Sequence, residues 1–263
     1  MDKENLRIPI AIVIAGIFIA GAVYLSNNTP RSENSTETAT TQKNQSYTKI
    51  RSISATDHIV GNPDANIAIV EYSDTECPAC KSFHNTMNRI VTEYAKDGKV
   101  AWVYRNMPID QLHSKSRKEA EAAECVGSLG GPVSYWKMLN NIYAITPSNN
   151  ELEAAELPKL AVAAGVKLSD FNTCWNSGKM AEKIEQDFED GFAAMNTESL
   201  SGTPLSIIIL RKPLSFKATA SIQNTFAKMG GIEISDDGKM LGMSGAMPYE
   251  VVKMLIEMVL SDK

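Results

Sequence analysis

The stretch "DTECPACKSF", Asp74 to Phe83, places two cysteines three positions apart between a predicted strand and a predicted helix. The strand is Ile67 to Tyr72, "IAIVEY", a β-branched apolar run that is typical of a buried strand. From Lys81 onward apolar residues recur at helical spacing, and Val100 to Tyr104, "VAWVY", is a second strand. A right-handed β-α-β unit brings both cysteines to the carboxyl end of the first strand. The pattern therefore predicts an α/β fold with a cysteine pair at one edge of its sheet.

The rest of the chain adds a helical block and three further elements. Helical patterns fill Ser114 to Asn196. Within them "GSLGGP", Gly127 to Pro132, indicates a turn between two helices, because no strand precedes these glycines as a phosphate loop requires. A buried strand at Leu205 to Leu210, a hairpin-like segment around Asp237-Gly238 and a helix from about Pro248 complete the domain. The predicted order is strand, helix, strand, helical block, strand, strand, helix.

The N-terminal segment predicts export. Ile8 to Leu25 is a run of eighteen residues without a charge, which as a helix reaches about 27 Å, enough for a thin bilayer. Lys3 and Arg7 precede it and no charge follows until Arg31, so the positive-inside bias predicts a single-pass protein of the cell membrane. Its N-terminus would be cytoplasmic and its main domain extracytoplasmic. The alternative is a signal peptide cleaved after Ala20-Gly21-Ala22, which would give a secreted protein.

Composition divides the chain into an anchor at 1–25, a disordered polar tether at 26–54 and a folded domain at 55–263. Sixteen of the twenty-four residues from Ser26 to Lys49 are Ser, Thr, Asn or Gln, so this segment buries too little apolar surface to fold. A net charge of -5 without a basic patch argues against a nucleic-acid partner. Disulfides persist outside the cytoplasm, and the chain has four cysteines, an even number.

Four segments together resemble a known family. They are "VGNPDANIAIVEYSDTECPACKSF", "AAEC", "FNTCW" and "SGTPLSIII". With them the chain resembles a membrane-anchored DsbA-like thiol:disulfide oxidoreductase. The resemblance implies a thioredoxin fold with a helical domain, here at about 110–198, inserted after the second core strand. Between Leu210 and Gly231 the chain departs from the family, which usually has a tight turn there, so the role of 211–231 is left open.

The two cysteines of the motif have the spacing of a redox pair. Residues three apart on a helix are close enough for Cys77 and Cys80 to form a disulfide. Cys77 lies where the helix begins, so unpaired N–H groups favour its thiolate and make it the predicted nucleophile, with Cys80 as the resolving thiol. Pro78 suits the first helical turn because its missing N–H is no loss there. A metal site is not expected, because Cys125 and Cys174 are distant in sequence and the histidines are scattered.

Further site residues depend more on the resemblance. Glu71 is in phase with the buried residues of its strand, and the family likeness implies an acid that shuttles a proton for the resolving thiol; the alternative is an acid at the strand end that reaches solvent. Thr203-Pro204 matches the family's cis-proline loop, which offers backbone groups to a substrate peptide. His84 lies seven positions from Cys77 on the same helix, and we expect it to be an exposed helix residue; the alternative is that it faces the site. We expect His113 to lie in a loop.

Cys125 and Cys174 fall in the helical insertion. In the chain-entropy model, closing a loop of roughly 49 residues stabilises the fold by about 4 kcal/mol, and similar proteins carry a cysteine pair in matching places. A structural disulfide is therefore predicted, with two free buried thiols as the alternative.

The predicted function is a monomeric exported oxidase without a cofactor. Its partners would be reduced or misoxidised exported proteins and a membrane protein that recycles Cys77 and Cys80. Strongly oxidising relatives usually have a histidine where Ala79 stands. The alternative functions are therefore those of a milder oxidant, an isomerase or a reductase. Isomerases of this type normally carry an N-terminal dimerisation domain, and the tether is too short to be one. A redox-inert chaperone or a copper-handling protein is the alternative from another class.

Overall fold

The structure, a computed structural model, describes residues 45–195 and 200–262. The predicted transmembrane segment and most of the predicted tether lie outside these residues. Among the helices of the described ranges, none has both the length and the apolar character that a membrane crossing needs.

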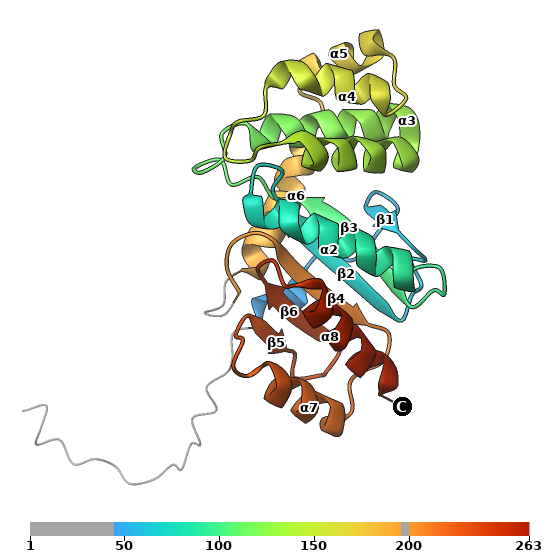
Figure 1. Cartoon of the computed structure of the whole chain (residues 1–263), viewed down its shortest axis with the longest axis vertical. Helices are drawn as coiled ribbons and strands as arrows, with labels where there is room; N and C mark the ends of the chain where they lie inside the picture. The colour runs from blue at the N-terminus through green and yellow to red at the C-terminus, as the bar shows by residue number, and fades with distance from the viewer. Residues whose placement is uncertain (1–44, 196–199, 263) are drawn as a thin grey trace, which may run out of the picture. The chain divides into compact units, whose positions relative to one another are not determined.

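A six-stranded mixed sheet forms the centre of the domain, in the order β1-β3-β2-β4-β6-β5 (Figure 1). The strands β2 and β3 are parallel, as the predicted β-α-β unit requires, and the other neighbouring pairs are antiparallel. The strands are β1 (His58–Val60), β2 (Ile67–Ser73), β3 (Val100–Asn106), β4 (Leu205–Leu210), β5 (Ile232–Ile234) and β6 (Met240–Ser244). The predicted hairpin is confirmed as β5 and β6.

Helices cover both faces of the sheet. The α-helices are α2 (Pro78–Tyr94), α3 (Ser116–Ile145), α4 (Leu157–Ala163), α5 (Leu168–Ser177), α6 (Ala181–Ala194), α7 (Phe216–Phe226) and α8 (Tyr249–Ser261), with short 3-10 helices η1 (Ser46–Lys49) and η2 (Ala154–Glu156). In Figure 1, α2 and α8 lie over the near face, and α6 lies behind the sheet. The predicted helical insertion is confirmed, because α3 to α6 follow β3 directly and precede β4.

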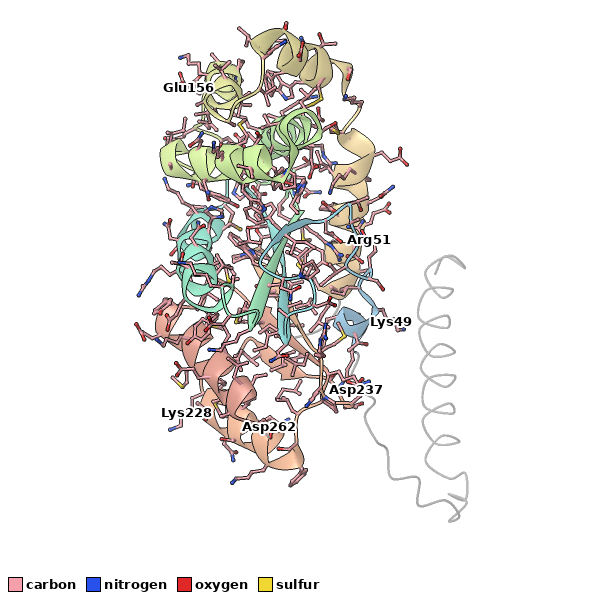
Figure 2. The ribbon with its side chains drawn as sticks, turned by 90° about the vertical axis from the view of Figure 1, so that its right-hand side faces the viewer. Lys49, Arg51, Glu156, Lys228, Asp237 and Asp262 are labelled. Carbon is pink, nitrogen blue, oxygen red and sulfur yellow. A yellow bond between two sulfur atoms is a disulfide. The ribbon has the colours of Figure 1, made fainter. Side chains whose placement is uncertain are left out.

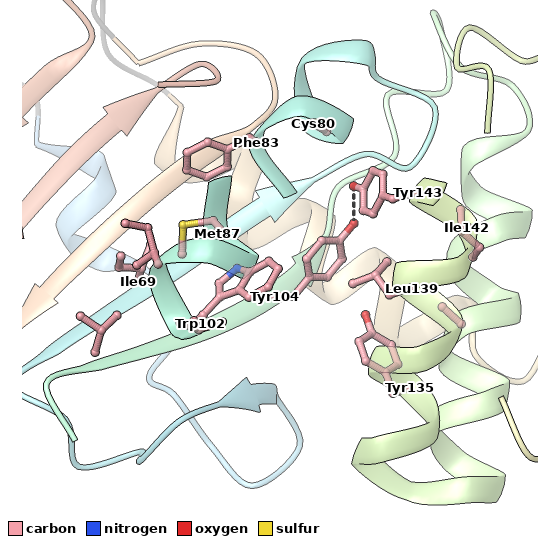
Figure 3. Packing of buried hydrophobic residues seen from close by; sticks show 14 of the residues in the cluster. Ile69, Cys80, Phe83, Met87, Trp102, Tyr104, Tyr135, Leu139, Ile142 and Tyr143 are labelled. Carbon is pink, nitrogen blue, oxygen red and sulfur yellow. Dashed lines mark hydrogen bonds between the residues drawn. The ribbon is translucent and has the colours of Figure 1, made fainter. Parts of the chain in front are cut away.

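The main core continues from the sheet into the insertion (Figure 3). Tyr104 of β3 packs against Tyr135 of α3, and Trp102 of β3 packs against His84 of α2 and Trp136 of α3. Trp102, Tyr104 and Tyr135 are fully buried. Large aromatic side chains contribute much buried area, about 150–250 Å² each. The insertion is therefore held against the sheet by a shared core, and this fixes α3 relative to the start of α2.

The packed part of the chain begins earlier than predicted. The polar tether was predicted to extend to residue 54, whereas residues 45–54 lie against the domain, with Tyr47 completely buried beside α6. Arg51, which is labelled in Figure 2, donates a hydrogen bond from its side chain to Asp187 of α6 at 2.6 Å. One large buried aromatic ring and one partly buried ion pair therefore attach this segment to the domain in spite of its polar composition.

The predicted turn between two helices at Gly127 to Pro132 is confirmed. The element α3 consists of two helical arms that meet at a kink, where Gly131 has a non-helical φ of 76° and Pro132 follows. Both ends of α3 are thereby brought to the start of α2. The segment 211–231, whose role was left open, contains α7, and the Ser215 side chain caps it by accepting a hydrogen bond from the Ala218 N–H.

Candidate active site

Cys77 and Cys80 lie at the carboxyl end of β2, where the sequence placed them. Cys77 is the N-cap residue of α2, Pro78 is the first helical residue, and Cys80 lies one turn further on. Both thiols are free. Cys77 keeps 9% of its surface exposed and Cys80 none, so only Cys77 is open to another protein.

The pKa values of the two thiols are shifted in opposite directions. The hydrogen bond from the Cys80 thiol, together with the backbone N–H groups of Cys80 and Ala79, lowers the pKa of Cys77 to about 6 in spite of partial burial. Burial raises the pKa of Cys80 well above its ordinary value, and the negative charge on Cys77 raises it further. At neutral pH Cys77 is therefore a thiolate and Cys80 a thiol that donates to it.

The loop before β4 faces the exposed thiolate. The Thr203-Pro204 peptide bond is cis, in agreement with the resemblance. The Thr203 carbonyl oxygen lies 3.5 Å from Cys77 Sγ. Backbone groups of this loop are thus available beside the reactive sulfur, where an extended peptide could pair with them.

Glu71 is buried in the sheet behind the cysteine pair. Its side chain is fully buried, so the alternative of an acid that reaches solvent is wrong. Burial raises the pKa of Glu71 to about 7, against the opposing effect of a hydrogen bond from Trp102 Nε1 at 2.9 Å. The Ser73 hydroxyl favours the charged forms of both Glu71 and Cys80 and so lowers the pKa of each. This arrangement places a group that can hold a proton near neutral pH close to the buried thiol.

Several polar side chains around Cys80 were not predicted from the sequence. The hydroxyl groups of Tyr104 and Tyr143 lie 2.9 Å apart, as the dashed line in Figure 3 shows, and Ser73 Oγ is 3.2 Å from the Tyr143 hydroxyl. Asp74, also missed, accepts hydrogen bonds from the Ile109 N–H at 2.7 Å and shares one of 2.9 Å with His113. Tyr143 and Ile109 lie far along the chain from the motif, so no local signal reveals these contacts.

The prediction for His84 is wrong, and that for His113 is confirmed. His84 is 2% exposed, stacks on Tyr143 with ring centroids 4.3 Å apart, and pairs through Nε2 with Asn140 at 2.6 Å. Burial lowers its pKa to about 4, so it is neutral at physiological pH. The second arm of α3 covers this face of α2, and this converts an expected surface residue into a core residue. His113 lies in the loop before α3.

Cys125 and Cys174 form the predicted disulfide. Their Cα atoms lie 5.8 Å apart, and the bond joins α3 to α5 across 49 residues. Both cysteines are at most 2% exposed. Among the described residues, no group of three or more histidine, cysteine or acidic side chains is arranged to hold a metal ion.

Comparison with known proteins relates this site to a family. The thioredoxin family model matches residues 53–212. Among curated proteins, the chain is 28% identical over 150 residues to a Na(+)/H(+) antiporter NhaA of Mycolicibacterium gilvum, which covers 56% of this chain but only 22% of the antiporter. It is 25% identical over 190 residues to a protein of Rickettsia felis assigned as a protein-disulfide oxidoreductase, covering 69% of this chain and 64% of that one.

A solved structure with the same architecture is BdbD from Bacillus subtilis in its oxidised form. The TM-score is 0.57 at 21% identity, and the match covers 78% of this chain and 92% of BdbD. Similarity at this level establishes the fold. The chain therefore belongs to the thioredoxin family, and its fold, with a helical insertion after β3, is that of the DsbA-like thiol:disulfide oxidoreductases.

Proposed function

We propose that this protein exchanges disulfides with exported proteins through Cys77 and Cys80, acting as an oxidase. The observation that carries the proposal is the pairing of an exposed thiolate at the start of α2 with a fully buried thiol one turn behind it. Such a pair separates the two roles of thiol–disulfide exchange, because one sulfur meets the substrate and the other resolves the mixed disulfide.

The oxidising cycle proceeds in two steps. A substrate thiolate attacks Cys77 Sγ of the Cys77–Cys80 disulfide, a substrate–Cys77 bond forms, and Cys80 leaves as a thiolate. Glu71, acting through Ser73, supplies the proton that the buried Cys80 thiolate requires. A second substrate thiolate then attacks its partner sulfur in the mixed disulfide, and Cys77 leaves as a thiolate. The substrate loses two electrons and gains a disulfide, while the Cys77–Cys80 pair is reduced.

The direction of exchange follows from the stability of the leaving thiolate. A pKa of about 6 for Cys77 stabilises the reduced form and makes the disulfide the more oxidising. We expect a potential well above the value of about -270 mV for thioredoxin and nearer the value of about -180 mV for protein disulfide isomerase. Equilibration of the full chain with glutathione buffers measures it. A value near that of thioredoxin would favour the reductase alternative instead.

The proposed setting is the outer face of the cell membrane. The apolar run Ile8 to Leu25 supports an anchor, and nineteen residues, 26–44, separate it from Gln45, the first residue that the structure describes. Even fully extended, such a segment reaches at most about 65 Å, so a monomeric domain would stay near the membrane and a membrane redox partner there could reoxidise it. After cell fractionation, the chain should sediment with membranes and be digested by external protease. Recovery in the medium would instead indicate the cleaved, secreted form.

A further inference from the structure

The residue that follows β2, Asp74, makes backbone hydrogen bonds with both redox cysteines. Its N–H donates to Cys80, with the nitrogen 3.4 Å from Sγ, and its carbonyl oxygen accepts from the Cys77 N–H at 3.1 Å. Asp74 is 1% exposed, so water does not compete for these contacts. The position of the Asp74 backbone therefore fixes the direction from which the Cys80 sulfur receives a hydrogen bond.

Three donors hold the Asp74 side chain. Oδ1 accepts from the Glu76 N–H at 2.8 Å, and Oδ2 accepts from the Ile109 N–H at 2.7 Å. His113 Nδ1 lies 2.9 Å from Oδ2, and because a carboxylate only accepts, this nitrogen carries the proton of the bond. Hydrogen bonds to an ionised acceptor are stronger than those between neutral groups. The carboxylate therefore ties residue 74 firmly to the loop between β3 and α3.

The helical insertion holds the same turn. The Tyr143 hydroxyl of α3 donates to the Asp74 carbonyl oxygen at 3.4 Å, and the Thr75 hydroxyl donates to Glu119 of α3 at 2.6 Å. The turn from Asp74 to Cys77 is thus attached to a loop and to a helix that both lie far along the chain. Its backbone is fixed before any substrate arrives.

Cys80 needs a fixed donor at one step of the exchange. When a thiolate attacks Cys77 Sγ of the Cys77–Cys80 disulfide, the sulfur–sulfur bond breaks and Cys80 takes its electron pair as a thiolate. This charge forms in a fully buried site. Burial raises the pKa of Cys80, and the Asp74 N–H is among the groups that act against this effect. A donor already directed at the sulfur stabilises the charge without reorganisation, as the donors of an oxyanion hole do.

We propose that Asp74 is a positioning residue for the resolving cysteine: its carboxylate fixes the turn so that its own backbone N–H points at Cys80 Sγ and stabilises the thiolate that leaves. The inference rests on the proposed function for the role of Cys80, but not for the direction of exchange. His113 acts one step further away, because it contacts the carboxylate and not the sulfur.

The charge of Asp74 has an opposing effect. A buried carboxylate close to the cysteine pair repels the Cys80 thiolate and so disfavours its departure. The three donors offset much of this charge, whereas the N–H acts on the sulfur at contact distance. We therefore expect the positioning effect to be the larger one, and the two effects predict opposite results for the same substitution.

Asp74→Asn tests the proposal in the full chain. The amide keeps the size of the side chain, but its nitrogen cannot accept, so at least one of the three donors loses its partner. Reduction of the Cys77–Cys80 disulfide by dithiothreitol, with free thiols trapped by N-ethylmaleimide and counted by mass spectrometry, should be about tenfold slower or more. Faster reduction would mean that charge repulsion dominates and would overturn the proposal.

Asp110→Asn is the matched control. It makes the same chemical change in the same loop, but Asp110 is partly exposed and pairs with Arg117 at 2.8 Å. Its rate of reduction should stay within about twofold of that of the unaltered chain. A tenfold effect there would show that the assay reports any loss of negative charge near the site and would remove the evidence for positioning.

A second rate separates positioning from general loosening of the turn. In Cys80→Ala, the Cys77 thiolate attacks oxidised glutathione and no charge develops at position 80. Adding Asp74→Asn to that variant should change this rate by less than about twofold. Equal slowing of both reactions would show that the substitution only disorders the turn, and the proposal would be wrong.

His113 should act only through Asp74. His113→Phe removes one donor to the carboxylate, so it should slow reduction by dithiothreitol several-fold alone and add nothing in the Asp74→Asn chain. Independent effects of the two substitutions would contradict the assigned order of contacts.

If Asp74→Asn does not fold, NMR of the unaltered chain decides. The Asp74 amide proton should be protected from solvent exchange and should change its chemical shift when the disulfide is reduced. Exchange at the rate of an exposed amide would refute the contact with Cys80. None of these measurements depends on the reduction potential. A potential near that of thioredoxin would remove the proposed oxidase function and leave the role of Asp74 standing.

Discussion

Replacing Cys80 with alanine should trap substrate proteins on Cys77. In the reduced chain, the Cys77 thiolate attacks a protein disulfide, a mixed disulfide forms, and one substrate thiolate leaves. Normally Cys80 would then attack Cys77 Sγ and release the substrate. Without it the complex should accumulate, visible on non-reducing gels after incubation with a disulfide-containing protein such as insulin, and it should disappear with reductant.

The matched control is Cys77→Ala, which should trap at least about a hundredfold less. With a pKa of about 6, most of the Cys77 thiol is ionised at neutral pH. In the variant without Cys77, the effects of Cys77 on Cys80 are gone, but burial still raises the pKa of Cys80. Access acts in the same direction, because Cys77 retains 9% exposure and Cys80 none. Removal of Cys77 also removes one hydrogen-bond partner of Cys80, so some residual reactivity of Cys80 is compatible with the mechanism. Equal trapping by both variants would show that the assigned roles of nucleophile and resolving thiol are wrong.

Local sequence patterns were sufficient for the elements that position the cysteine pair. The apolar run of β2, the helical spacing of α2 and the Cys-Pro start of that helix all lie within 28 residues, from Ile67 to Tyr94, and each was predicted at or near its observed position. The sequence also contains the signals that predict the helix α7. Ser215 is a standard N-cap residue, and Ile222 and Phe226 lie one helical turn apart on its buried face.

Features that arise from distant packing were missed. His84 would be exposed if no other element covered its face of α2. The residues that cover it, Asn140 and Tyr143, lie more than fifty positions later in the sequence. The same holds for Tyr47, which is buried against a helix well over a hundred residues away. Hydrophobic periodicity indicates which face of an element is apolar, but it does not indicate which distant element packs there. Buried polar contacts such as those of Ser73 with Tyr143 are therefore invisible to it.

Loss of the Cys125–Cys174 disulfide should be the most destabilising change that leaves the chemistry intact. The bond closes a loop of 49 residues, so in the chain-entropy model its removal lowers the free energy of unfolding by about 4 kcal/mol. For a domain of this size that corresponds to a decrease in Tm of about 8–16 °C. The double variant Cys125→Ala/Cys174→Ala avoids a stray thiol, and urea denaturation measures the difference.

Disulfide exchange by the same variant should stay close to that of the unaltered protein. Thiol–disulfide exchange requires that an attacking thiolate reach a sulfur atom, and Cys125 and Cys174 are at most 2% exposed. The bond therefore stays oxidised while Cys77 and Cys80 cycle, and the insertion it joins continues to hold the turn before Cys77. A folded double variant that no longer oxidised its substrate would instead mean that electrons pass from Cys80 to Cys125. The buried bond would then be a second redox centre, not a structural link between α3 and α5.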